Sequence, residues 1–174
     1  MNRITAILLL FCLALTAGCR QEKARIRNWQ DPDGRFQINI PEGWRETAHG
    51  PRGFYFRFQA PDADNGLYAA IKIETGEAPE HFTDREVIRA FEASLGAEYS
   101  NIEVIEQREI KSGERKGRLL SVRCLIGKAR MRVMRAVFIH DVEYYVVTCT
   151  GLEKHFARHS AAFLKTCKSL HIET

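Results

Sequence analysis

Alternating apolar and polar positions predict several short strands in the first half of the chain. Residues 36–40 alternate with a period of two, which is typical of a strand that is buried on one face. Residues 41–43, Pro-Glu-Gly, then end that strand in a turn. Two more strands are predicted at residues 54–58 and 67–73, separated by a loop at residues 61–66 that contains proline, aspartate and glycine.

Two later segments carry the spacing of amphipathic helices. Thr83 followed by Glu86 forms the capping-box pattern that starts a helix, and apolar residues then recur at helical spacing until Gly96. A second helix is predicted at residues 152–168, with one apolar stripe that packs on the sheet. The stripe consists of Phe156, Phe163 and Leu164.

A run of four strands is predicted between these two helices. The strands are residues 102–110, 117–126, 129–139 and 142–150. The last three are joined by the two-residue connections Gly127-Lys128 and His140-Asp141, which suit tight hairpins. The order of elements therefore predicts an α+β fold in which helices cover an antiparallel β-sheet.

Residues 1–18 have the pattern of a bacterial export signal. Arg3 supplies the positive charge, and an apolar run follows at residues 4–15. As a helix this run would rise only about 18 Å, which is too short for a hydrocarbon core of about 30 Å. We therefore interpret residues 1–18 as a lipoprotein signal peptide and not as a transmembrane helix.

The end of the signal determines what happens to Cys19. Residues 15–19, Leu-Thr-Ala-Gly-Cys, resemble the bacterial lipobox, which implies that Cys19 is acylated and that the signal is cut before it. Two or three acyl chains are enough for stable anchoring in a membrane. The alternative is an ordinary signal peptide that is cut nearby and leaves Cys19 as a free thiol.

A short polar segment separates Cys19 from the folded part. Residues 19–28 carry four basic side chains and no apolar periodicity, so they are predicted to form a flexible tether. Each basic side chain gains about 1 kcal/mol if it lies near anionic headgroups, or the segment is simply solvated. By resemblance to enterobacterial sorting, Arg20 after Cys19 favours the outer membrane. The predicted location is therefore the cell envelope, anchored by lipid and facing the periplasm.

Residues 29–174 are predicted to form a single domain with a recognisable pattern. The segment Phe36-x-Ile38-x-Ile40-Pro41-x-Gly43-Trp44, the strand at residues 142–148 and the closing helix that ends before Ser169-Leu170 resemble PsbP-like and Mog1-like domains, including DcrB-like bacterial lipoproteins. The resemblance covers about residues 29–172. It implies an α/β/α sandwich and a noncatalytic accessory role, and it supplies no catalytic residues to carry over.

Composition and motifs argue against several classes of function. The formal net charge of +4 falls to +3 when Arg3 leaves with the signal, which is too small to indicate nucleic-acid binding. The chain has no G-x-S-x-G, phosphate-binding glycine loop, H-E-x-x-H or C-x-x-C motif. We therefore predict that the protein is not an enzyme and requires no cofactor.

Candidate metal ligands are few. His155 and His159 are four residues apart on the closing helix, a spacing that can present two imidazoles to a metal, but no carboxylate lies between them. A solvated helix face is favoured, and no metal site is predicted. Aspartates in the loops lack the glycine and terminal glutamate of an EF-hand and are interpreted as turn formers: Asp31, Asp33, Asp62 and Asp64.

Three cysteines remain in the domain: Cys124, Cys149 and Cys167. If the two hairpins set the register, Cys124 lies opposite Met131 and Met131 lies opposite Thr150, which places Cys149 on the other face of the sheet. Cys167 lies far along the closing helix, at a distance from Cys149 that a disulfide cannot span. We therefore predict three separate, buried, free thiols.

Arginine is concentrated between residues 108 and 135. The basic residues of this region are Arg108, Arg115, Lys116, Arg118, Arg123, Lys128, Arg130, Arg132 and Arg135. The same register makes Arg123 and Arg132 direct cross-strand neighbours, a pair of like charges that costs stability unless an anion compensates it. Arg123, Arg130 and Arg132 are therefore candidates for docking an acidic partner or lipid headgroups. The alternative is that these arginines pair with the helix carboxylates Glu86, Glu92 and Glu98.

Two classes of function follow from the sequence. The first is a lipid-anchored, noncatalytic interaction or accessory protein of the cell envelope, held to the membrane by acylated Cys19 and bound to an envelope protein partner. The second is a periplasmic module that binds a small ligand or a metal in an apolar pocket with converging polar groups.

Overall fold

The computed structural model describes residues 25–50, 55–64 and 66–173. The predicted signal at residues 1–18, the acylation of Cys19 and the first part of the tether lie outside the described residues. In the part of the chain that is described, no helix is long and apolar enough to cross a membrane.

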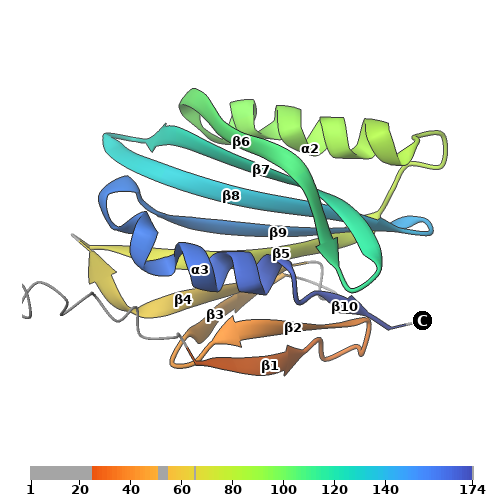
Figure 1. Ribbon diagram of the computed structural model, residues 1–174, viewed down its shortest axis with the longest axis horizontal. Coiled ribbons are helices and arrows are strands. Elements are labelled where there is room, and N and C mark those ends of the chain that lie inside the picture. The colour runs from red at the N-terminus through yellow and green to blue at the C-terminus, as the bar shows by residue number, and fades with distance from the viewer. Residues whose placement is uncertain (1–24, 51–54, 65, 174) are drawn as a thin grey trace, which may run out of the picture.

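One large antiparallel sheet organises the fold (Figure 1). Its seven strands have the spatial order β3-β4-β5-β9-β8-β7-β6. Their bounds are β3 Arg45–His49, β4 Tyr55–Asp64, β5 Leu67–Glu77, β6 Ser100–Ser112, β7 Arg115–Ile126, β8 Ala129–His140 and β9 Glu143–Leu152. Strands β6 to β9 follow one another along the chain and lie side by side, which confirms the predicted strand run.

A second, three-stranded sheet lies below the first in Figure 1. It consists of β1 Ile26–Gln30, β2 Phe36–Pro41 and β10 His171–Ile172, in the order β1-β2-β10. The sequence placed residues 26–28 in the tether, but they pair with β2 because antiparallel hydrogen bonds satisfy their backbone groups. Strand β1 therefore begins at Ile26, inside the segment that was predicted to be a tether.

The two α-helices in the described part of the chain lie on opposite faces of the large sheet. Helix α2, Asp84–Glu98, begins at Thr83 with a complete capping box to Glu86, as predicted. Helix α3, Phe156–Cys167, follows the short 3-10 helix η2, Glu153–His155, and lies in front of the sheet in Figure 1. The α+β fold with helices covering an antiparallel sheet is thus confirmed.

Alternation along the strands divides the core between the two faces. The larger cluster packs the sheet against α3 and β2, and includes Phe36, Phe58, Phe138 and Phe163, each 0% exposed. The smaller cluster lies on the α2 face around Leu95, Val122 and Val133.

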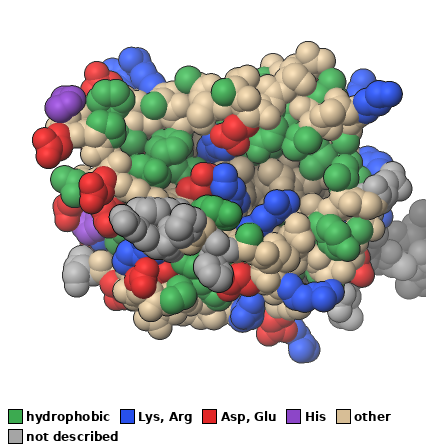
Figure 2. Space-filling model, turned by 180° about the vertical axis from the view of Figure 1, so that it is seen from behind, with side chains coloured by type: hydrophobic (Ala, Val, Ile, Leu, Met, Phe, Trp, Pro, Cys, Tyr) green, Lys and Arg blue, Asp and Glu red, His purple; other side chains and the backbone are tan. Residues whose placement is uncertain are grey.

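The uncovered part of the α2 face is polar. Figure 2 views the molecule from behind and shows charged side chains of both signs in the middle of this face. Arg57 of β4 lies directly opposite Lys72 of β5, and Lys72 Nζ lies 2.9 Å from a carboxylate oxygen of Glu74. Lys72 is therefore compensated by Glu74 on its own strand.

Register at the last hairpin differs from the prediction. The hairpin turns on Asp141 and Val142, so His140 pairs with Glu143, and Met131 lies opposite Leu152 instead of Thr150. The φ of +51° at Asp141 explains the difference, because aspartate tolerates the left-handed conformation that such a turn requires. The shift is two residues, so every side chain keeps its predicted face.

The cysteines are partly as predicted. Cys124, Cys149 and Cys167 are all buried and free, and Cys124 lies on the opposite face from Cys149. The predicted separation of Cys149 and Cys167 was wrong, because their Sγ atoms lie 4.0 Å apart. After Cys149 the chain continues to the end of β9, and α3 then runs back over the same strand. The helix therefore carries Cys167 back towards Cys149 instead of away from it.

Candidate functional site

The three candidate arginines lie on one face at one end of the sheet. Arg123 of β7 lies directly opposite Arg132 of β8, as the Gly127-Lys128 hairpin predicts. Arg130 lies two positions before Arg132 and therefore points to the same face. This is the α3 face, beside the point where β9 ends and η2 begins.

Arg123 is compensated by carboxylates on both sides. Its Nη1 lies 3.0 Å from Glu103 Oε1 of the neighbouring strand β6, and its Nε lies 2.5 Å from Glu153 Oε1 of η2. The hydrogen bond to Glu103, followed by the charge of Glu103, raises the pKa of the Arg123 guanidinium above its ordinary value. Arg123 therefore has little capacity left for an external anion.

Arg132 has a different environment. Its Nε donates a long hydrogen bond of 3.4 Å to Ser121 Oγ, and its guanidinium carbon lies 5.3 Å from the centroid of the Phe156 ring. Among the described residues, no carboxylate oxygen lies within 4.0 Å of the Arg132 nitrogens. The Arg132 charge therefore lies over an aromatic ring and receives no counter-ion from the described part of the chain.

A hollow of about 500 Å³ lies around Arg132, between α3 and strands β6 to β8. We call it the Arg132 groove. Its charged lining residues are Glu106, Arg108, Arg132 and Glu153, and its other lining residues are Met134, Phe156, Ala157, Ser160, Ala161 and Leu164. Glu106 and Arg108 form an ion pair of 2.5 Å with each other. The groove thus combines an apolar wall with one uncompensated positive charge.

Two adjoining hollows extend the groove past the end of the sheet. One of about 350 Å³ is lined by residues that include Arg123, Arg130 and Glu153, and one of about 480 Å³ is lined by Arg130, Leu152, Glu153 and Lys154. Arg130 is exposed, and no carboxylate oxygen in the described ranges lies within 4.0 Å of its guanidinium. The extended surface therefore gains a second uncompensated arginine.

The sequence left open that the arginines pair with carboxylates of a helix. Two other arginines do so. Arg118 Nε lies 3.6 Å from Glu92 Oε1, and Arg135 Nη2 lies 2.8 Å from Glu98 Oε1. Glu86 instead accepts hydrogen bonds from Thr83 in the capping box. Arg123 and Arg132 have no such bond to α2, because their side chains point to the opposite face of the sheet.

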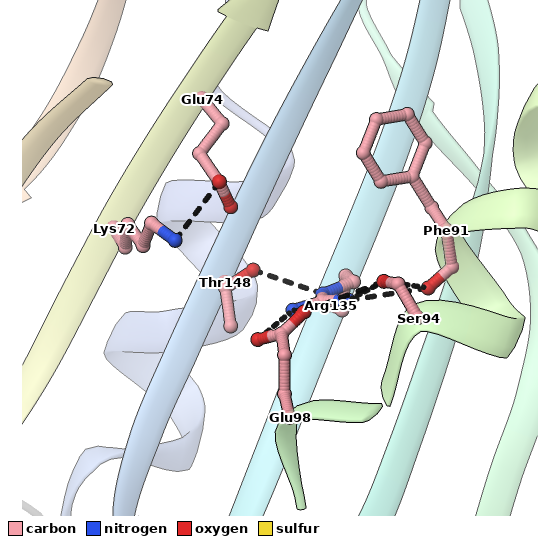
Figure 3. A network of polar contacts seen from close by, with 7 residues as sticks. All are labelled: Lys72, Glu74, Phe91, Ser94, Glu98, Arg135 and Thr148. Atoms are coloured by element: carbon pink, nitrogen blue, oxygen red, sulfur yellow. Dashed lines mark hydrogen bonds and ion pairs between the residues drawn. The ribbon is translucent and has the colours of Figure 1, made fainter. Parts of the chain in front are cut away.

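Arg135 is the residue whose role the sequence did not reveal. It is 2% exposed, on the α2 face, and its guanidinium donates to Thr148 of β9, to the backbone carbonyl of Phe91, to Ser94 and to both Glu98 oxygens (Figure 3). The available signal was a single charge inside an apolar run at residues 133–138. This network joins α2 to the sheet, so we assign Arg135 a structural role.

Two of the candidate metal ligands have structural partners, and the prediction that Asp62 and Asp64 lie in a turn was wrong, because both belong to strand β4. His159 lies with its ring centroid 5.8 Å from both the Trp44 and Phe163 rings, so it belongs to the aromatic layer under α3. Asp31 is 2% exposed and accepts two hydrogen bonds from the Arg35 guanidinium, at 2.6 and 3.0 Å. In the described part of the chain, no group of three or more His, Cys, Asp or Glu side chains is placed to hold a metal ion.

The architecture defines an α+β sandwich, and solved structures share it. No protein-family model and no curated protein sequence matches the chain. The cyanobacterial PsbP of Synechocystis sp. PCC 6803 matches with a TM-score of 0.65 and 14% identity, over 86% of this chain and 94% of that one. LpqN of Mycobacterium tuberculosis, a protein involved in cell envelope biogenesis, matches with a TM-score of 0.69 and 11% identity, over 89% and 94%.

A third solved structure also shares the fold. The Ran-binding protein Mog1p of Saccharomyces cerevisiae matches with a TM-score of 0.61 and 11% identity, over 86% of this chain and 96% of that one. The chain therefore has the PsbP/Mog1-like fold that the sequence pattern implied.

The uncompensated charge leads to a prediction about stability. Replacing Arg132 by threonine removes the like-charge pair with Arg123 and introduces a good strand former, at the loss of one long hydrogen bond and one cation–π contact. Because these small effects oppose one another, we expect the free energy of unfolding to change by no more than about 0.5 kcal/mol. Urea unfolding of the R132T variant measures this change.

Lys116→Thr is the matched control for that variant. Lys116 is 68% exposed in its side chain, lies on β7 away from the groove, and its Nζ is 4.0 Å from Glu109 Oε2. The same change of one positive charge is expected to be equally mild there. A loss of about 2 kcal/mol or more for Arg132→Thr alone would mean that Arg132 is a structural residue.

Proposed function

We propose that the protein is a lipid-anchored, noncatalytic accessory protein of the bacterial cell envelope, and that its Arg132 groove binds an acidic segment of a partner protein. The observation that carries this proposal is the guanidinium of Arg132, which lies over the Phe156 ring and has no carboxylate partner among the described residues. A carboxylate that reached this guanidinium would form a charge-assisted hydrogen bond with it.

The shape of the groove favours a protein segment over a small ligand. A small-ligand site buries most of its ligand in a concave pocket, whereas the three hollows adjoin one another along the side of α3 and around Glu153. Apolar side chains on one wall and arginines on the other suit an amphipathic segment that carries acidic residues.

The fold supports a role in binding and not in catalysis. Mog1p, which shares the fold, is a Ran-binding protein, and LpqN is involved in cell envelope biogenesis. The described part of this chain offers a groove of charged and apolar side chains, while His159 packs against aromatic rings and Asp31 pairs with Arg35.

The predicted anchor is compatible with the position of the first strand. Six residues separate Cys19 from Ile26, the first residue of β1. The seven residue steps from Cys19 to Ile26 span at most about 25 Å when extended. Acylation of Cys19 would therefore keep the domain close to the membrane surface, where its partner is an envelope protein.

Site-directed photocrosslinking tests where the partner binds. Ala157 and Ala90 are exposed alanines on α3 and α2, and only Ala157 lines the groove. With benzoylphenylalanine at either position of the full chain in living cells, we expect a discrete protein adduct from position 157 and none from position 90.

The other outcomes of this experiment have definite meanings. Equal adducts from both positions, or none from position 157, contradict a protein partner in the groove. Adducts to lipid alone at position 157, with retention on anionic vesicles that falls as salt is added, would assign the arginines to lipid headgroups instead.

A further inference from the structure

Two buried thiols meet at the junction of α3 and the large sheet. Cys149 lies near the end of β9, Cys167 is the last residue of α3, and both are 0% exposed. Their Sγ atoms are 4.0 Å apart, which is van der Waals contact between sulfurs. They belong to the larger core cluster, in which Cys167 is the last helical side chain before the chain turns towards β10.

We propose that Cys149 and Cys167 form an intramolecular disulfide when the chain folds under oxidising conditions. Bond formation requires the two sulfurs to approach from 4.0 Å to about 2.05 Å. One partner lies on a central strand of the sheet and the other at a helix terminus, so side-chain rotation and a small shift of the helix end supply the movement. In the cell the inference rests on the proposed export, because a disulfide persists in the periplasm and not in the cytosol.

The exchange reaction balances with an external disulfide as the oxidant. The thiolate of one cysteine attacks a sulfur of glutathione disulfide or of an envelope thiol oxidase, which forms a mixed disulfide and releases one thiol. The thiolate of the other cysteine then attacks the protein sulfur of that mixed disulfide and releases the second thiol. Two protein thiols and one external disulfide thus become one protein disulfide and two external thiols.

Burial determines when this reaction takes place. Exclusion of water raises the pKa of the Cys149 thiol, so in the folded protein it rarely reaches the thiolate form that attacks a disulfide. Neither sulfur is accessible to an oxidant once α3 has docked. The mixed disulfide therefore forms during folding, while a thiol is still exposed, and docking of α3 on β9 brings the second thiol to it. The finished bond is afterwards protected from reduction.

The bond would hold the wall of the Arg132 groove. Phe156, Ala161 and Leu164 of α3 line that groove, and Cys167 fixes the far end of the same helix to the sheet. Cys124 has no part in this arrangement, because it lies in the smaller core cluster on the opposite face. One disulfide and one free thiol are therefore expected in the folded domain.

Peptide mapping of the full chain tests the inference. The chain is purified in detergent, refolded with a glutathione redox buffer, alkylated in denaturant without reductant and digested with trypsin. Trypsin places the three cysteines in separate peptides, residues 124–128, 136–154 and 166–168. We expect peptides 136–154 and 166–168 to be joined, and peptide 124–128 to carry the alkyl group. Alkylation of all three peptides would overturn the proposal.

Thermal unfolding gives a second readout with matched controls. Closing this loop is expected to raise the Tm by about 6 to 10 °C relative to the reduced protein. The Cys124→Ala variant should keep that difference, whereas the Cys149→Ala/Cys167→Ala double variant should lose it. An equal response to reductant in both variants would contradict the assignment.

A further measurement tests whether the chain is exported. The same mapping is applied to the chain taken from cells without refolding. A joined pair after refolding together with free thiols in the cellular protein would support the disulfide-forming pair and contradict the exported location.

Discussion

Replacing Arg135 by methionine is expected to lower the free energy of unfolding by about 3 kcal/mol. Arg135 Nη2 donates to the two Glu98 oxygens at 2.8 and 2.9 Å, and Nη1 donates to Ser94 Oγ at 2.9 Å. The variant leaves those acceptors without their donor, together with the hydroxyl of Thr148, which is 2% exposed. Methionine fills much of the volume, so the loss reports mainly the polar network and not a cavity.

The size of this effect follows from how α2 is attached. Only Val87 and Leu95 of the helix are buried, and the Phe91 ring contacts Tyr144 with centroids 4.7 Å apart. With so small an apolar face, the Arg135 network supplies a large share of the attachment. We therefore expect α2 to detach in the R135M variant, which hydrogen exchange of its amides would detect.

Arg118→Met is the matched control. Arg118 also pairs with α2, through Glu92 at 3.6 Å, but its side chain is 39% exposed. Solvent screens that pair, so its loss is expected to cost less than about 1 kcal/mol. Urea unfolding of both variants measures the difference. Equal, small losses would show that Arg135 does not hold the helix.

Changing Cys19 to serine is expected to abolish labelling by a fatty-acid analogue. Acylation requires a thiol, and Cys19 is the cysteine that follows the small residues at the end of the export signal. The wild-type protein should carry label and fractionate with the outer membrane on a density gradient. Serine at this position should reduce the label to background, because no second lipobox cysteine is present in the signal.

Cys12 provides the control for this variant. It lies inside the apolar run of the signal and is removed with it, so Cys12→Ser should leave labelling unchanged. Label that persists on the Cys19→Ser protein would contradict the anchor. Loss of label from both variants would point to a general defect in export.

Local patterns were sufficient for most elements of the fold. The Thr83 and Glu86 capping box marks the start of α2, and Gly127, with a φ of +60°, marks the hairpin between β7 and β8. Strand β3 was not predicted because its sequence, Arg-Glu-Thr-Ala-His, has no apolar alternation and forms by pairing with β4. The two residues of β10 likewise depend on β2, which no local signal reports.

The candidate site was predictable to the extent that it depends on a single hairpin. The pairing of Arg123 with Arg132 follows from the Gly127-Lys128 turn alone. The contribution of Glu153 and Phe156 does not, because it depends on where α3 lies on the sheet. The same placement brings Cys149 and Cys167 together, so both features required the tertiary structure.

Arg132 is proposed to bind a partner protein and to contribute little to the stability of the domain. The most direct measurement is the yield of the position-157 photo-adduct in the Arg132→Thr protein, compared with Lys116→Thr, at equal expression and with Tm measured on both. A charge-assisted hydrogen bond of about 1.5 kcal/mol corresponds to about a tenfold change in affinity. We expect a yield reduced about tenfold for Arg132→Thr alone, with the Tm of both variants unchanged. Equal yields from the two variants would contradict it.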